Sequence, residues 1–159
     1  MTLPAGTHLR RATAADRSAI ERLLVESDLI IHALPDWIDR FWVAERSGAN
    51  GTEPELLGVA GIELYADGCL LRSVAVRPDL RGTGLGRTLV ERALDSARDA
   101  GARRAYLLTL TAERWFPRLG FERIGRADVP ESVLASGEFQ GACPASAVVM
   151  TKPLELPDG

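Results

Sequence analysis

Short apolar runs and one helical repeat predict the secondary structure of the first part of the chain. Three runs have the length and composition of β-strands: His8–Ala12, Phe41–Glu45 and Leu56–Tyr65. Between the first two runs, Ile20, Leu23 and Leu24 recur at helical spacing. We therefore expect a helix between the first and second strands that ends near Glu26.

Sequence signals mark both ends of this helix. Thr13 and Asp16 have the spacing of a capping box, which places the helix start just after them. Ser27–Pro35 breaks the helical pattern with an apolar stretch that ends in proline. Two interpretations of this stretch stay open, a second helix or a lid.

The later part of the chain alternates strands with helical segments. A turn at Ala66–Gly68 leads into a fourth strand that ends at Val76. A long amphipathic helix follows, stopped by Gly101, with one apolar stripe formed by Leu85, Leu89, Ala93 and Ala97. The other predicted elements are a strand at Arg104–Leu110, a short helix at Ala112–Leu119 capped by Thr111, a strand at Gly120–Ile124, a helical turn at Val129–Ser136 and a strand at Ala145–Lys152.

This order of elements predicts the fold class. Strands first, followed by alternating strands and helices, indicate an α/β (α+β) protein with a mixed sheet and helices on both faces. A chain of 159 residues with 46% hydrophobic and 26% charged residues fits one globular domain, so we expect residues 1–159 to form a single domain.

Composition and charge exclude several classes of function. A net charge of −3 and a pI near 5.5 argue against a nucleic-acid-binding protein, which needs a basic face. The sequence has no long apolar span and its start lacks the features of a signal peptide, so we expect a cytoplasmic protein without membrane contact. Its two cysteines, Cys69 and Cys143, lack metal-ligand spacing, and we expect neither a metal site nor a disulfide framework.

A glycine-rich loop between the fourth strand and the long helix is the main functional signal. It comprises Arg81, Gly82, Thr83, Gly84, Leu85, Gly86 and Arg87. Glycines at a strand-to-helix junction let the backbone approach a ligand, and the amides at a helix start favour an anion. The spacing fits neither the dinucleotide fingerprint nor the P-loop, so we predict a phosphate site of another kind.

The pattern Arg-x-x-Gly-x-Gly at Arg81, Gly84 and Gly86, directly after Val74–Val76, resembles the acetyl-CoA loop of the GNAT N-acetyltransferases. The resemblance implies a mostly antiparallel mixed sheet of six to seven strands. It also implies that amides of residues 82–87 hold the pyrophosphate of acetyl-CoA. The backbone of Val74, Ala75 and Val76 would line the pantetheine arm, and Trp115 and Phe116 would pack along CoA or in the core.

Further segments narrow this resemblance. Leu108–Phe121, Val129–Ser132 and Cys143–Met150 together resemble the arsenic-resistance branch of these N-acetyltransferases, and the same layout is similar to the acetyltransferase domain of N-acetylglutamate synthases. Both relatives imply a small acceptor with an amine and a carboxylate or other acidic group. Pro144 and Ala145 stand where the synthases carry basic residues, which argues against glutamate itself as the acceptor. Dimerisation is common among these enzymes, so a homodimer is a possible state.

Acceptor binding is assigned to several polar residues. Arg72 is the first candidate for the carboxylate, because an arginine fork pairs bidentately with one. Its alternative role is that of a solvated strand arginine. The other candidates are Glu26, Ser27, Asp28, Thr109 and Ser146, each of which could equally be structural, and Cys143, whose thiolate could bind trivalent arsenic but which is more commonly a small buried hydrophobic residue.

The chemical step needs a neutral amine, a donor to the oxyanion and a proton for the leaving thiolate. Many family members place a tyrosine where this chain has Phe116, so either Tyr106, Ser73 or a water molecule is the acid, or the thiolate leaves unassisted. Glu63 is the candidate base, with an exposed strand carboxylate as the alternative. The resemblance thus implies an enzyme that transfers the acetyl group of acetyl-CoA to the amine of a small amino acid or toxic amino-acid analogue, of the arsenic-resistance type. Two rival interpretations remain: synthesis of N-acetylglutamate, and a CoA-binding sensor without catalysis.

Overall fold

The computed structural model describes residues 3–27, 38–48, 53–142 and 146–154. They fall into two compact units, an N-terminal unit of Met1–Gly61 and Ser73–Ala93, and a C-terminal unit of Ile62–Arg72 and Leu94–Gly159. The strands are β1 (Thr7–Arg11), β2 (Phe41–Arg46), β3 (Glu55–Tyr65), β4 (Gly68–Val76), β5 (Arg104–Thr109), β6 (Glu122–Ile124) and β7 (Val148–Pro153). The helices are α1 (Arg17–Glu26), α2 (Leu85–Asp99) and α3 (Glu131–Leu134), and a π-helix, η6, spans Glu138–Ala142.

The seven strands follow the order β1-β2-β3-β4-β5-β7-β6. Neighbours pair antiparallel at β1–β2, β2–β3, β5–β7 and β6–β7, whereas β4 and β5 run parallel. The parallel pairing joins Cys69 with Ala105 and Leu70 with Tyr106. The predicted mixed and mostly antiparallel sheet is therefore confirmed.

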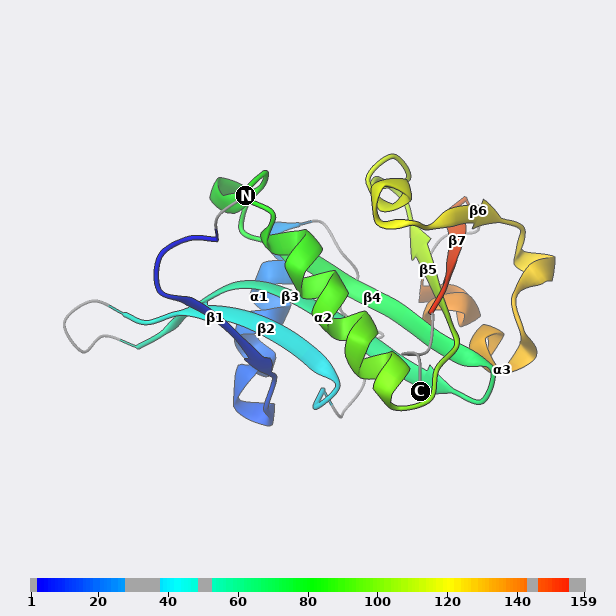
Figure 1. Ribbon diagram of the computed structural model, residues 1–159, viewed down its shortest axis with the longest axis horizontal. Helices are drawn as coiled ribbons and strands as arrows, with labels where there is room; N and C mark the ends of the chain where they lie inside the picture. Colours follow the sequence, from blue (N-terminus) through cyan, green and yellow to red (C-terminus); the bar gives the residue numbers. More distant parts are fainter. Residues whose placement is uncertain (1–2, 28–37, 49–52, 143–145, 155–159) are drawn as a thin grey trace. The chain divides into compact units, whose positions relative to one another are not determined.

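In the N-terminal unit, helices cover both faces of the strands (Figure 1). Ile20 and Leu24 of α1 share a buried cluster with Val59 of β3. Because successive strand residues point to opposite faces, Gly58 faces the other side. There a Cβ on Gly58 would lie 2.8 Å from Leu89 Cδ1 of α2. Gly58 thus lets α2 pack directly against β3, and the expectation of helices on both faces is confirmed for this unit.

The C-terminal unit has its own core around β5 and β7. Tyr106 of β5, Val149 of β7, and Val129 and Val133 of the 129–136 segment are all buried in one cluster. Phe139 of η6 packs against the same cluster. This packing places α3 and η6 against the strands of the unit.

Several local predictions need correction. Thr111 does not cap a helix over 112–119, because the hydroxyl of Thr109 accepts the Ala112 N–H at 2.9 Å and only Phe116–Leu119 forms a short 3-10 helix. Pro117, at the second position of that helix, lacks the N–H that a longer helix would use. The last strand begins at Val148 rather than residue 145, and the π-helix η6 was not predicted. The stretch predicted as a second helix or lid lies outside the described residues from 28 onward.

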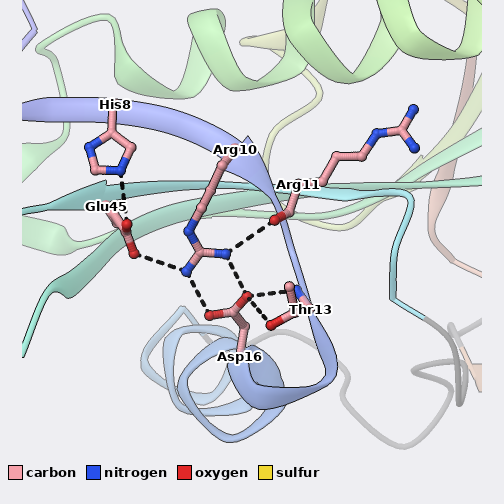
Figure 2. A network of polar contacts seen from close by, with 6 residues as sticks. All are labelled: His8, Arg10, Arg11, Thr13, Asp16 and Glu45. Atoms are coloured by element: carbon pink, nitrogen blue, oxygen red, sulfur yellow. Dashed lines mark hydrogen bonds and ion pairs between the residues drawn. The ribbon is translucent and has the colours of Figure 1, made fainter.

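Charged side chains join β1 to β2 and to the turn before α1 (Figure 2). Arg10 donates to Asp16 through two nitrogens, Nη1 to Oδ2 and Nη2 to Oδ1, both at 2.8 Å, and Nη2 lies 2.9 Å from Glu45 Oε2. The Thr13 N–H donates to Asp16 Oδ2 at 2.7 Å, as the predicted capping box requires. His8 Nε2 lies 2.8 Å from Glu45 Oε1. Hydrogen bonds from the Arg10 guanidinium hold the pKa values of Asp16 and Glu45 below their usual range.

Replacing Arg10 with Met should lower the free energy of unfolding at pH 7 by about 2 kcal/mol, because two carboxylates would keep their charges without the cation. A carboxyl with a depressed folded-state pKa contributes stability above its unfolded pKa and loses it as pH falls through the folded pKa. The difference between wild type and Arg10→Met should therefore shrink on acidification to about pH 3. Urea unfolding at both pH values measures it.

The matched control is Arg87→Met, because the Arg87–Glu91 pair on α2 leaves 53% and 56% of the two side chains exposed. That substitution should change the unfolding free energy by less than about 0.5 kcal/mol. An Arg10→Met effect that is equally large at acidic and neutral pH would contradict an ionic role for the network.

Candidate active site

The glycine-rich loop has the geometry of an anion site. β4 leads through a short 3-10 helix, Pro78–Leu80, into the loop, and α2 begins at Leu85. Gly82 and Gly84 have φ values of +86° and +89°, which favour glycine. A Cβ added to Gly82 would meet nothing within 4 Å. The loop therefore presents open space next to the first amides of α2, and these features fit the pyrophosphate of a CoA thioester.

Two further features indicate that this loop is a preformed anion site. The Thr83 hydroxyl donates to the Leu80 carbonyl at 2.7 Å and accepts the Leu85 N–H at 3.4 Å, which fixes the loop to its flanking helices. Arg81 and Arg87 are exposed at its two ends and can complement a negative charge.

Ser73 marks an unusual backbone position in β4. Its φ of +55° is the one positive value found among the described residues that are not glycine. Such a conformation is costly for a residue with a side chain and is found preferentially at functional sites. Ser73 lies between Arg72 and Val74–Val76, the segment predicted to line pantetheine. Val74 and Val76 are half-buried and Ala75 is buried.

A buried polar cluster occupies the C-terminal unit. Glu63 of β3 and Arg72 of β4 form an ion pair with 2.5 Å between Oε2 and Nη1, and the Arg72 side chain has no exposed area. The Tyr65 hydroxyl donates to Glu63 Oε1. Burial, with the charge of Glu63, raises the pKa of Tyr65, so the phenol keeps the proton that it donates. Two predicted site residues, Glu63 and Arg72, are thus in direct contact.

Glu138 of η6 belongs to the same cluster. Its side chain is buried, and its Oε2 has no hydrogen-bond partner within the described part of the chain. Burial raises the pKa of Glu138 to about 7; the charge of Arg72 lowers it and that of Glu63 raises it further. Ser136, which is 2% exposed, lies close enough to Tyr65 to lower its pKa slightly. Tyr65, Ser136 and Glu138 were not predicted from the sequence, and no sequence signal marks the π-helix that places Glu138.

The other candidates from the sequence lie in varied surroundings. Tyr106 is buried on β5 in the core of the C-terminal unit, and burial raises its pKa. Trp115 and Phe116 contact each other edge to face, with ring centroids 4.9 Å apart. Thr109 is buried at the turn after β5, and Ser146 is exposed just before β7. Asp28 and Cys143 lie outside the described residues.

Glu26 and Ser27 end α1 in the N-terminal unit. Glu26 lines a groove of about 440 Å³ together with Arg22, Glu55 and Arg77. Within it Arg77 Nη1 lies 2.6 Å from Glu55 Oε2, so these two charges compensate each other. The Ser27 hydroxyl is buried at the C-terminal end of the helix.

The described residues contain neither a candidate metal-binding cluster nor a candidate membrane-spanning helix. In residues 3–27, 38–48, 53–142 and 146–154, no three or more His, Cys, Asp or Glu side chains come together as a metal site would require. Over the same ranges, no helix has both the length and the apolar character of a bilayer span. Cys69 is buried and its pKa is raised to about 12 by burial, which makes it a poor thiolate.

Comparison with known proteins agrees with this geometry. Residues 37–123 match the family model described as an acetyltransferase (GNAT) domain. Over 134 residues the chain is 34% identical to an amino-acid acetyltransferase of Mycobacterium tuberculosis. This match covers 79% of this chain and 74% of that protein. It is 29% identical over 137 residues to an uncharacterised N-acetyltransferase of Chlorobaculum tepidum, covering 81% and 84%.

Solved structures share the fold. N-acetylglutamate synthase from Neisseria gonorrhoeae, complexed with coenzyme A and N-acetyl-glutamate, has a TM-score of 0.78 at 24% identity, over 96% of this chain and 36% of that chain. This chain thus spans about a third of that synthase. A Mycobacterium tuberculosis protein in complex with CoA has a TM-score of 0.74 at 26% identity, over 93% of this chain and 99% of that chain.

Gly84→Asp should weaken acetyl-CoA binding at least about tenfold, because a carboxylate would stand where the pyrophosphate is expected. Isothermal titration calorimetry measures the affinity. Gly101→Asp is the matched control, since Gly101, like Gly84, has a positive φ, +101°. Gly101 has open space around its Cβ position and follows the C-terminal end of α2, away from the loop sequence. Equal affinities for the two variants would exclude the loop as the pyrophosphate site.

Glu138→Gln should make the protein progressively more stable than wild type as pH rises from about 5 to 8. The folded-state pKa of Glu138 is raised, so between the unfolded and folded values the native state binds the extra proton and wild-type stability falls with rising pH. The difference in unfolding free energy between the two proteins reaches at most about 3 kcal/mol. Urea unfolding across this range measures it, with Glu131→Gln, an exposed carboxylate of α3, as the control. Parallel stability curves for wild type and Glu138→Gln would show that Glu138 titrates normally.

Proposed function

Because the chain belongs to the acetyltransferase (GNAT) family, we propose that it transfers the acetyl group of acetyl-CoA to the amine of a small amino acid acceptor. The enzyme class follows from the family match and the relatives. The acceptor class is supported above all by the buried guanidinium of Arg72, which immediately precedes the pantetheine segment along β4.

The donor side of the proposal relies on the backbone. The pyrophosphate would lie on the loop amides of residues 82–87, between the exposed Arg81 and Arg87. Val74–Val76 would pair with the pantetheine amides, and a backbone N–H near Val74 would donate to the oxyanion. Acetyl-CoA, when bound, supplies the thioester carbon that the neutral amine attacks.

In this proposal, recognition of the acceptor relies on a buried positive charge. A guanidinium without exposed area recognises a carboxylate strongly, because water competes little for either group. Glu63 already contacts Nη1, so we propose that the acceptor carboxylate shares the guanidinium with Glu63. This arrangement selects acceptors that carry an acidic group next to the amine.

Relatives favour an ordinary amino acid over a toxic analogue. The Mycobacterium tuberculosis relative is an amino-acid acetyltransferase, and none of the relatives named above is an arsenic-resistance enzyme. Arsenic resistance and an acceptor other than glutamate remain predictions from the sequence, as do the homodimer and a cytoplasmic location.

The test is release of free CoA by purified protein with acetyl-CoA and a panel of acceptors: glutamate, glutamine, arginine, phosphinothricin, arsinothricin and the carboxylate-free amine agmatine. We expect turnover with acceptors that carry a carboxylate next to the amine and no turnover with agmatine. Turnover confined to the two toxic analogues would support a resistance enzyme. Binding of acetyl-CoA without transfer to any acceptor would overturn the proposal in favour of a CoA-binding sensor.

Arg72→Lys should raise the KM for the preferred acceptor at least about tenfold and leave the Kd for acetyl-CoA unchanged, because lysine keeps the charge but loses the planar fork. Steady-state kinetics and calorimetry measure the two constants. Arg104→Lys on β5, where Arg104 contacts Thr151, is the control and should keep the wild-type KM. A changed acetyl-CoA affinity in Arg72→Lys would instead assign Arg72 to the donor.

A further inference from the structure

Glu138 is a buried carboxyl group without a role in the proposed function. It is 8% exposed and lies on η6, the π-helix of Glu138–Ala142. Its Oε2 is fully buried and lacks a hydrogen-bond partner among the residues that the structure describes. π-helical turns occur frequently at functional sites, and a buried polar atom without a partner costs free energy. A ligand that supplies the missing partner would recover that cost.

The charges around Glu138 define which ligand fits. Among the described residues, two charged groups act on it: Glu63 from β3 and Arg72 from β4. Arg72 and Tyr65 both donate to Glu63, so Glu63 is the anion of the ion pair. Glu138 is then a second carboxyl beside a cation that is already compensated. In its ionised form the cluster has one negative charge too many, which a ligand cation would balance.

An amine is the cation that acetyl transfer requires. An amino acid in solution carries its amine as ammonium, with three N–H donors and one positive charge. These match an ionised carboxylate with an unpartnered oxygen. We propose that Glu138 binds the ammonium group of the acceptor and accepts its proton. The proposal rests on the proposed function and adds the catalytic base.

Glu138 suits this role better than Glu63, the base expected from the sequence. Both oxygens of Glu63 are engaged, one by Arg72 and one by Tyr65. Glu138 has no such donor on Oε2, and burial raises its pKa to about 7. A base that gains and loses its proton near neutral pH is the more effective one.

The carboxylate of Glu138 takes one proton from R–NH3+, which leaves neutral R–NH2 and a protonated Glu138. The nitrogen lone pair attacks the thioester carbon, the C–S bond breaks, and the second nitrogen proton goes to the CoA thiolate. Glu138 then releases its proton to solvent. The sum is one amide, one CoA thiol and one proton.

The pH dependence of kcat/KM, measured by free-CoA release, tests the role directly. Wild type should lose activity on acidification as Glu138 becomes protonated. Glu138→Gln should reduce kcat by about 100-fold or more at neutral pH and remove this acidic limb. Glu138→Asp should retain an acidic limb at a lower rate, because it keeps a carboxyl group. Glu131→Gln, on the exposed face of α3, should match wild type.

A second measurement does not depend on activity. In protein labelled with carbon-13 at glutamate carboxyl groups, the signal absent from Glu138→Gln identifies Glu138. That signal should titrate near neutral pH, and a signal already titrated below about pH 5 would overturn the proposal. Thermal unfolding should show that both Glu138 variants remain folded.

The outcomes separate the two proposals. Activity of wild type with an unaltered rate and acidic limb in Glu138→Gln would overturn the role of Glu138 and leave the proposed function intact. Absence of transfer from wild type to every amine of the panel would overturn the proposed function, and the role of Glu138 with it. Loss of the acidic limb in Glu138→Gln, with the limb retained in Glu138→Asp, would support the role.

Discussion

The buried guanidinium of Arg72 is the constraint on which the polar cluster of the C-terminal unit depends. A charge without exposed area is tolerated only with compensating charge and hydrogen bonds. Glu63 supplies the charge, and Tyr65 donates to the other oxygen of Glu63. Removing Glu63 would leave a buried cation without its compensating charge and would deprive Tyr65 of its acceptor, so the three side chains have to be considered together. The resulting cluster is ionic and largely hidden from water.

Glu138 changes the balance of this cluster. A single ion pair would be neutral and complete, and its most direct interpretation would be structural. A second carboxyl with an unpartnered oxygen makes the cluster a site that a cation can complete. The same buried surroundings that strengthen the Glu63–Arg72 pair also disfavour the ionised form of Glu138, because low polarity favours paired charges and penalises unpaired ones. One environment thereby gives two carboxyl groups different chemical behaviour.

In the proposed function, β4 joins the residue that recognises the acceptor to the segment that recognises the acetyl-CoA donor. Arg72, with its buried charge, is followed directly by Ser73 with its left-handed backbone and then by Val74–Val76. The loop and the start of α2 come next, where the chain offers amides rather than side chains. In the proposed function, donor recognition relies on backbone geometry, which many sequences can supply, whereas acceptor recognition relies on a few side chains. This division explains why the family is easier to assign than the acceptor.

The sequence by itself determined the features that local chemistry controls. Strand and helix periodicity predicted most elements, because side-chain burial repeats with the backbone period, and the glycine spacing with Arg81 predicted the loop before α2. Only the tertiary structure showed the partners of each buried charge. Glu63 and Arg72 are separate candidates along the sequence, yet they face each other because β3 and β4 are neighbouring strands. Glu138 reaches them from a π-helix, a conformation without a distinct sequence signal, and its pKa depends on burial and on charges more than sixty residues away. Desolvation and charge pairing are properties of the packed molecule, which is why the chain alone could not identify its buried carboxyl.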